Sequence, residues 1–383
     1  MFALQHLAGS LRDFAGWAPL GLPAFLFYIT VVVFVHEMGH FLMARFFGAR
    51  VDVFSIGFGP EIFGWHDKRG TRWRVSWQPV GGYVKFAGDA DAASTPDRKA
   101  AERPAAEQAG MMAFRPLHQR ALVAAAGPFA NFVLAVLLFT GIFLAVGHTV
   151  QAPLIGRVFE NSPAAEAGLR PGDLVVRLDG KAINDFEQLP EIVGLSGGRA
   201  LGMEVSRAGR AVAVTVTPRL TQTRDLFGDG EKRMTIGITS DPRAPLTTTS
   251  YNLPGAFWAA CTRTGDIVRL TLKGIGQLVT GRASLEQLRG PVGIAQITRK
   301  VALFGLLPFI SLIAVLSVSI GLINLFPIPL LDGGHLLYYA CEAVLGRPLG
   351  ERAQDVGFRL GLVLVLGLML LATWNDLARL NLF

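Results

Sequence analysis

Residues 21–46 read GLPAFLFYITVVVFVHEMGHFLMARF, and this stretch decides the architecture of the chain. It is long enough to cross the hydrocarbon of a bilayer, which takes about 20 residues of helix. Its only ionisable groups before Arg45 belong to the run His36-Glu-Met-Gly-His40. Residues four apart on a helix share one face, so both histidines can bind one metal ion while Glu37 stands beside it as a base. We therefore expect zinc hydrolytic chemistry within a membrane.

The composition of the 383-residue chain also indicates a membrane protein. Hydrophobic residues make up 51% and charged residues only 17%, which is too apolar for an ordinary soluble protein. Three further apolar runs are candidates for spans, and they lie at 120–148, 301–331 and about 356–374. The fold class we predict is a polytopic α-helical membrane protein with about four transmembrane helices.

The distribution of basic residues predicts the orientation of the chain. Segment 45–120 carries 12 lysines and arginines, whereas the tail before the first span has only Arg12. Segment 45–120 should therefore be cytoplasmic, and the long section after the second span should be external. The N-terminus lacks a basic leader followed by a small-residue cleavage site, so we expect the first span to be retained. The net charge of +7 suits lipid headgroups, and no pattern of basic and aromatic residues suggests nucleic acid.

Two soluble regions are predicted between the spans. Alternating apolar residues at 51–88 indicate strands, and residues 89–110 have the composition of a flexible linker. Short strands are expected at 154–158, 174–178, 203–205 and 212–216. The passage Ser162-Pro-Ala-Ala-Glu-Ala-Gly-Leu-Arg-Pro-Gly-Asp173, followed by a strand, resembles the PDZ fold. Such domains bind extended peptides at a sheet edge, although a purely architectural role is a second interpretation.

The third metal ligand must come from another part of the chain, because catalytic zinc takes three protein ligands and keeps one open position. Asp332 is the best candidate. It follows the third span in Asn324-Leu-Phe-Pro-Ile-Pro-Leu-Leu-Asp-Gly-Gly334, where an acidic residue is costly unless it is paired with a cation. Helix capping by Asp332 is the alternative, and His335 is the rival ligand.

Several motifs together resemble the site-2 protease family (M50) of intramembrane zinc metalloproteases, and most closely its bacterial regulator-of-sigma-E protease type. They are the His-Glu-x-x-His run, Gly127-Pro-x-x-Asn131 in the second span, the inserted PDZ-like passage, Gly290-Pro-Val-Gly-Ile294, and the Asn324 to Gly334 passage. Some relatives carry two tandem PDZ domains, whereas the length available here allows one. By position, the resemblance implies that His36, His40 and Asp332 bind zinc. Glu37 would then be the general base, and Asn324 would bind substrate or hold the site in shape. For Asn131, helix packing and a substrate role are equally open.

The resemblance implies a function and a layout. The function is regulated intramembrane proteolysis of single-span membrane proteins, such as anti-sigma factors or remnant signal peptides, with Glu37 activating a zinc-bound water. The implied location is the bacterial inner membrane, with the PDZ domain on the periplasmic side and the active site towards the cytoplasm. An intramembrane metal transporter and a non-catalytic PDZ scaffold are the alternatives. The expected divisions are the first span at 1–50, a membrane-associated β-hairpin region and linker at 51–119, the second span at 120–148, the PDZ domain at 149–240, an amphipathic connector at 241–300, and the last two spans at 301–383.

Overall fold

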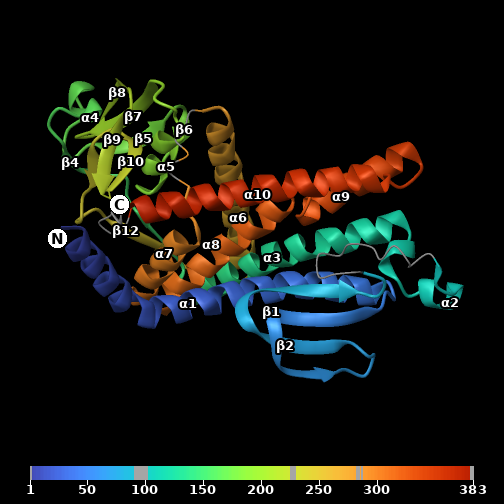
Figure 1. Ribbon diagram of the computed structural model, residues 1–383. Coiled ribbons are helices and arrows are strands. Elements are labelled where there is room, and N and C mark those ends of the chain that lie inside the picture. Colours follow the sequence, from blue (N-terminus) through green and yellow to red (C-terminus); the bar gives the residue numbers. More distant parts are fainter. Residues whose placement is uncertain (1, 90–101, 225–229, 282–284, 286–287, 380–383) are drawn as a thin grey trace. The chain divides into compact units, whose positions relative to one another are not determined.

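Among the residues that the structure describes, four helices are long and apolar enough to cross a membrane. Their apolar portions are Gly21–Phe46 of α1 (Phe2–Phe46), all of α3 (Leu117–Val146), all of α8 (Leu306–Asn324) and Arg352–Ala378 of α10 (Glu351–Arg379) (Figure 1). The computed structural model describes residues 2–89, 102–224, 230–281, 285 and 288–379. Large apolar side chains on these helices are exposed, among them Phe129 at 66% and Val363 at 71%, as expected where lipid is the neighbour. The chain is thus a polytopic membrane protein.

The third span is shorter than the apolar run that contains it. The run at 301–331 was expected to hold a span, and α8 is confirmed there as a helix long and apolar enough to cross a membrane. The run is not one helix, because α7 (Pro291–Leu303) ends inside it and Gly305, with φ of +113°, lies between α7 and α8. In the predicted connector at 241–300, α6 (Leu253–Val279) ends well before α7 begins. Apolar composition fixes the length of a run but does not mark a turn within it.

The contacts between residues divide the described chain into two units. The first comprises Met1–Phe139, Ala260–Val268 and Leu288–Phe383, and the second Thr140–Ala259 and Arg269–Gln287. In the first unit, glycines let the helices approach closely. A Cβ on Gly39 of α1 would lie 2.3 Å from the carbonyl oxygen of Ala126 in α3, and one on Gly321 of α8 would lie 2.9 Å from that of Pro128. Small residues serve this purpose in membranes, where close packing of backbones replaces the hydrophobic effect.

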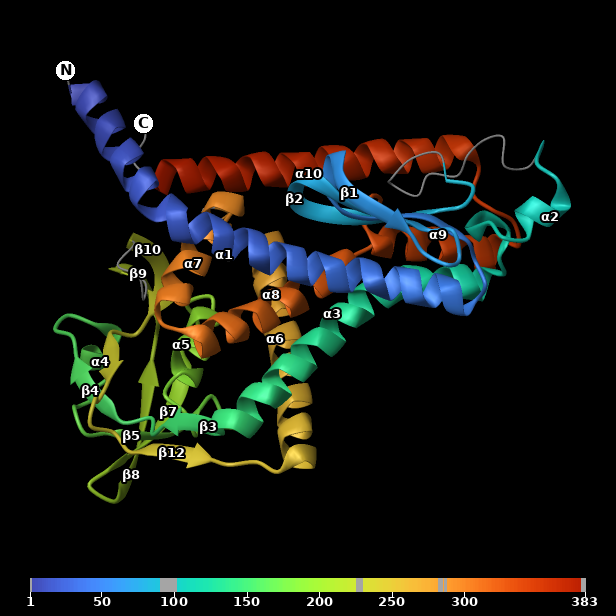
Figure 2. The ribbon, with the colours of Figure 1, turned by 90° about the horizontal axis from the view of Figure 1, so that it is seen from below.

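The strands predicted at 51–88 are confirmed as β1 (Val51–His66) and β2 (Arg72–Phe86), which lie against the second half of α1 in both views (Figures 1 and 2). Each strand folds back on itself, so that Phe54 lies opposite both Val84 and Trp73. Gly57 and Gly59 make this turn possible in β1, with φ of +87° and +86°. The resulting order across the sheet is 61–66, 72–76, 51–56 and 82–86.

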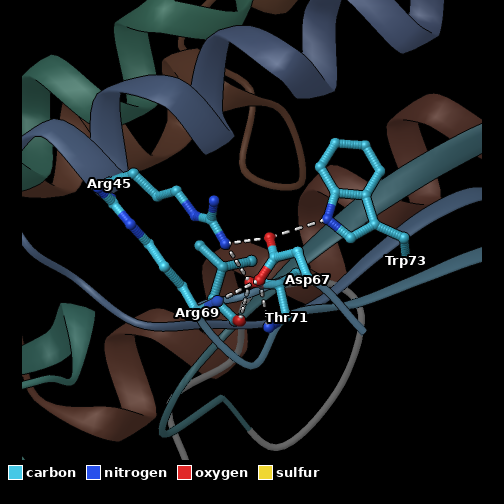
Figure 3. Close-up of polar contacts among 6 residues, drawn as sticks. Arg45, Asp67, Arg69, Thr71 and Trp73 are labelled. Carbon is cyan, nitrogen blue, oxygen red and sulfur yellow. Dashed lines mark hydrogen bonds and ion pairs between the residues drawn. The ribbon is translucent and has the colours of Figure 1, made fainter. Parts of the chain in front are cut away.

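A polar contact fixes this sheet to the end of α1 (Figure 3). Arg45 in the last turn of α1 forms an ion pair with Asp67 in the β1–β2 turn, and its guanidinium also donates to Thr71 Oγ1 at 2.9 Å. Trp73 Nε1 donates to the same carboxylate at 3.1 Å. Partial burial acts in the opposite direction, but the hydrogen bonds that Asp67 accepts, from Trp73 first, lower its pKa to about 2.

The second unit contains mostly short strands. The strands predicted at 154–158, 174–178, 203–205 and 212–216 are confirmed, and the sheet order is β6-β5-β7-β8. Side chains from β4, β5 and β7, including Ile155, Leu178 and Leu201, form its core. The elements are β3 (His148–Gln151), β4 (Ile155–Val158), α4 (Pro163–Glu166), β5 (Leu174–Leu178), β6 (Lys181–Ala182), α5 (Gln188–Gly194), β7 (Leu201–Arg207), β8 (Arg210–Val216), β9 (Arg219–Arg224), β10 (Gly230–Thr235), β11 (Ile238–Ser240) and β12 (Leu246–Thr249).

The second unit extends beyond residue 240, because β12 pairs with β3. The linker predicted at 89–110 lies mostly outside the described residues, and its described part includes the short helix α2 (Ala105–Gln108), followed by the 3₁₀ turn η2 (Met112–Phe114).

Candidate metal centre

The two histidines of α1 meet on one face of the helix, inside its membrane-spanning part. His36 and His40 are each only 8% exposed, and their Nε2 atoms are 3.2 Å apart. This pairing follows directly from the four-residue spacing, because side chains at i and i+4 stand one above the other. Both ring nitrogens that face each other can therefore approach the same ion.

Asp332 reaches this pair from a distant part of the chain. It is the first residue of α9 (Asp332–Leu345), and its Oδ2 and Oδ1 lie 3.0 Å from His36 Nε2 and 3.4 Å from His40 Nε2. The two glycines after it allow α9 to begin against the preceding loop, since a Cβ on Gly333 would lie 2.1 Å from the carbonyl oxygen of Phe326. The sequence thus places a carboxylate opposite two imidazoles.

The three side chains lie close enough together to share one zinc ion. Ligands of a tetrahedral zinc ion, at about 2.0–2.1 Å from it, lie about 3.3 Å from one another. The two Nε2 atoms are 3.2 Å apart, and each has a different oxygen of Asp332 within 3.4 Å. One ligand atom from each of the three residues lies within 4.8 Å of the others. Asp332 Oδ2 is also buried and has no hydrogen-bond partner among the described residues, a costly arrangement that a cation between the three groups would relieve. The residues present therefore fit a zinc ion.

The rival ligand His335 is not part of this group. Within the described chain, the set of side chains that could hold a metal here is His36, His40 and Asp332. The ring of His335 lies beside that of Tyr339, with 6.5 Å between the ring centroids. Helix capping does not account for Asp332 either, because no side-chain cap stands at the start of α9 and the residue before the helix is Leu331.

Residues of α3 support the histidines, and sequence reasoning had assigned them no part in binding metal. His40 Nδ1 lies 2.8 Å from the carbonyl oxygen of Val123, and Asn131 Nδ2 lies 3.3 Å from His36 Nδ1. A Cβ on Gly127 would come within 2.2 Å of His40 Nε2, so glycine leaves the room that the ring occupies. The Gly127-Pro-x-x-Asn131 motif was the available signal for this support.

Glu37 lies beside the sheet. Its carboxylate accepts a hydrogen bond from the backbone N–H of Val84, and a Cβ on Gly82 would lie 3.5 Å from Glu37 Cγ. Both belong to segment 82–86, which forms one edge of the sheet. Asn324, the possible substrate-binding residue, ends α8 and is half-buried, and its role stays a prediction.

Comparison with known proteins assigns this arrangement to a family. The model of peptidase family M50 matches residues 24–368, which contain both histidines, Glu37 and Asp332. The chain belongs to peptidase family M50. As a member of this family it is a membrane-bound zinc metalloprotease, and zinc is its cofactor.

Relatives of this M50 peptidase match it over nearly their whole lengths. It is 46% identical to "Putative zinc metalloprotease Atu1380" of Agrobacterium fabrum, over 93% of this chain and 95% of the relative. It is 42% identical to "Putative zinc metalloprotease R01501" of Rhizobium meliloti, over 93% and 96%. It is 40% identical to "Metalloprotease MmpA" of Caulobacter vibrioides, over 94% and 96%. The similarity therefore covers both units.

Proposed function

We propose that this M50 peptidase is an intramembrane endopeptidase of the site-2 type, in which His36, His40 and Asp332 hold zinc and Glu37 is the general base. One observation carries the proposal: two histidines of a helix long and apolar enough to span a membrane lie with Asp332 in a group that could hold a metal ion, and the same helix bears Glu37 between the histidines. Metal-dependent peptide hydrolysis uses a Lewis acid and a base side by side. His36, His40 and Asp332 would hold the first, and Glu37 would be the second.

The zinc ion and the side chains of the protein would have separate tasks in the reaction. Zinc, when bound, polarises a carbonyl oxygen and acidifies a coordinated water. Glu37 accepts the proton from the attacking water and returns it to the leaving amine. The hydrogen bond from the Val84 N–H holds the Glu37 carboxylate beside the ligands, so the base is already in position before substrate enters.

The substrate class follows from the position of the sheet edge. A transmembrane helix hides its peptide bonds in internal hydrogen bonds, so it must unwind before one of them can be cut. Segment 82–86 lies at the edge of the sheet next to Glu37, where an unwound segment could pair as an added strand. We therefore infer that the substrates are membrane proteins whose spanning segment unwinds to reach this edge. The finer class is what the resemblance to site-2 proteases implies: single-span proteins of the anti-sigma factor type or remnant signal peptides, cut in regulated intramembrane proteolysis.

The second unit supports a peptide-binding role of the PDZ type. A groove is lined by residues of α5 and of the segment around β11, with Leu189 and Val193 on the helix and Gly237 and Ile238 on the strand side. In the described part of the chain, β11 pairs with β4 in a two-stranded sheet, so an extended peptide could join its other edge in the groove that residues of β11 and α5 line together. Such a site would read a segment of substrate outside the membrane.

The proposed location is the bacterial inner membrane. The basic segment 45–120 would be cytoplasmic, the second unit periplasmic, and the active site would open towards the cytoplasm. Attachment of a membrane-impermeant reagent to single cysteines introduced at Arg69 and at Glu187 would test this, since only the second should react from the periplasm.

The decisive experiment replaces Glu37 with Gln, which has the same shape but cannot accept the proton. Cleavage of a model single-span substrate in detergent should fall by at least about a hundredfold, the range attributed to general bases, while bound zinc stays at one ion per chain. Glu187→Gln, a change at an acidic residue of the second unit, is the matched control and should leave both unchanged. Cleavage at the normal rate by Glu37→Gln would refute the proposed role. Zinc uptake into vesicles by the wild type would instead favour the transporter.

A further inference from the structure

Asn131 is a completely buried amide in the middle of α3, and it faces the metal ligand His36. Its Nδ2 lies 3.3 Å from His36 Nδ1, and its side chain has 0% exposure. Its backbone carbonyl accepts a hydrogen bond from Ser317 Oγ of α8 at 2.9 Å, which fixes this point of α3. Its own Oδ1 is buried without a hydrogen-bond partner among the described residues. A group this costly to bury needs an explanation beyond helix packing.

The requirements of a histidine ligand supply that explanation. A neutral imidazole carries one N–H and one lone pair, and the lone pair must point at the metal. In His36, Nε2 faces Asp332 and His40, so Nε2 must be the ligand atom and Nδ1 must carry the proton. An N–H in a buried site needs an acceptor, and the side chain next to Nδ1 is the amide of Asn131.

An amide can present its oxygen or its nitrogen in this position, because the two orientations have the same shape. With nitrogen towards His36, the amide would donate to Nδ1 and the proton would move to Nε2, which could then bind no metal. With oxygen towards His36, the amide accepts from Nδ1–H. Either orientation leaves part of the amide without a partner, so the ligand requirement of His36 decides between them.

For His40, a backbone carbonyl determines which ring nitrogen carries the proton. Its Nδ1 lies 2.8 Å from the carbonyl oxygen of Val123, which can only accept, so its Nε2 is free for the metal. Among the described residues, the contact of His36 Nδ1 is with a side chain, that of Asn131. A neutral side chain is suited to this task, because Asp332 and Glu37 already supply two negative charges to balance one divalent ion.

We propose that Asn131 is a positioning residue for the metal, whose Oδ1 accepts the Nδ1–H of His36 and thereby presents the Nε2 lone pair to zinc. This inference rests on the proposed metal site. It gives a chemical task to the Gly127-Pro-x-x-Asn131 motif, which otherwise contributes close packing of α3 against α1 and α8.

The test compares zinc affinity of the full chain in detergent by competition with a chelator. Asn131→Leu keeps the size but removes the acceptor, and its affinity should fall by about 10–100-fold, the usual cost of losing such a partner. Asn131→Asp keeps an acceptor and loses the donor, so its affinity should stay within about threefold of wild type or rise. Ser317→Ala disturbs the same helix contact without touching the amide and should bind zinc normally. When cobalt replaces zinc, the visible spectrum of Asn131→Leu should be shifted from that of the wild type. The spectra of Asn131→Asp and Ser317→Ala should not be shifted.

The outcomes distinguish a failure of the proposed metal site from a failure of the role given to Asn131. His36→Ala should lose zinc, and if it binds as tightly as wild type the proposed site fails. If His36→Ala loses zinc but Asn131→Leu does not, the metal site stands and the role of Asn131 is overturned. Asn131→Asp decides the matter even if the Leu variant does not fold, because weak zinc binding by a folded Asp variant would mean that the amide acts as a donor.

Discussion

Two carboxylates, one in each unit, have opposite surroundings. Asp173 in the second unit has 0% exposure and accepts from Arg207 Nε and Nη2, both at 2.8 Å, and from the backbone N–H of Arg170 at 2.8 Å. These bonds, the side-chain bond from Arg207 first, lower the pKa of Asp173. Asp332 in the first unit faces two imidazoles, and one of its oxygens makes no hydrogen bond among the described residues.

The difference separates a structural acid from a ligand. A carboxylate whose oxygens are saturated by the protein has no capacity left for an ion, whereas an unsaturated one is stable only with an external partner. Asp376 in α10 shows that burial alone does not make a carboxylate available to a metal ion. It is also buried, at 4% exposure, but it accepts from the backbone N–H groups of Gly290 and Gly293 at 3.1 and 2.8 Å, and so fastens α7 to α10.

The largest expected effect on this comparison comes from a substitution at Asp332. Asp332→Asn removes the charge that balances the ion, so zinc affinity should fall by more than about a hundredfold, beyond the loss caused by an outer partner. The unfolding of the metal-stripped protein should be unchanged or improved, because no uncompensated charge remains. Chelator competition and thermal unfolding measure the two effects. A variant with normal zinc affinity would show that Asp332 is not a ligand.

Asp173→Asn should have the opposite pattern. Zinc content should be normal, and the second unit should lose about 2 kcal/mol of stability, because Arg207 loses its charged partner but is partly exposed and can be hydrated. Hydrogen exchange of β5 and β7 in the full chain measures this locally. Unchanged exchange in these strands would mean that saturation of Asp173 contributes nothing to the fold.

Gly127 and Gly141 offer a matched pair on one helix. Gly127→Ala would place its methyl 2.2 Å from His40 Nε2 and should weaken zinc binding by about tenfold, because the ring must move. Gly141→Ala meets no atom within 4 Å and should leave zinc binding alone while favouring the helix slightly. Equal zinc affinities in the two variants would show that His40 does not need this space.

The smallest expected effect is on pH dependence. The folded pKa of Asp173 lies below its unfolded value of about 3.9, so its contribution to stability is present above that pH and is lost as pH falls through the folded pKa. Hydrogen exchange of β5 and β7, followed from about pH 6 to about pH 3, should therefore accelerate in the wild type relative to Asp173→Asn. Parallel profiles of the two proteins would contradict the assignment.

The sequence singled out the spans and the three side chains that the structure brings together for a common physical reason. Ionisable residues are so costly within an apolar run that His36, Glu37 and Asp332 stand out against their surroundings. The strands of the second unit were also predictable, because their alternation is local. The break at Gly305 was not, since a single glycine between two apolar helices leaves the composition of the run unchanged.

The supporting contacts of the site were beyond sequence reasoning. Asn131 and His36 are 95 positions apart, and whether an asparagine packs or positions depends on which atom of its neighbour it meets. The same holds for the Val84 N–H on Glu37, because a backbone group carries no sequence signature. Motifs therefore named the candidate ligands, and only the packing of α1, α3 and the sheet brought their neighbours into view.

The fastening of Arg45 to Asp67 and Trp73 has one more consequence (Figure 3). It fastens the turn between β1 and β2 to the end of α1, the helix that bears Glu37, and segment 82–86 is an edge of the same sheet. A strand advances about 3.3 Å per residue, and a guest paired along that edge would meet the base at a set number of residues from its anchor. The register of strand pairing, more than the identity of the side chains, would then determine which peptide bond is cut.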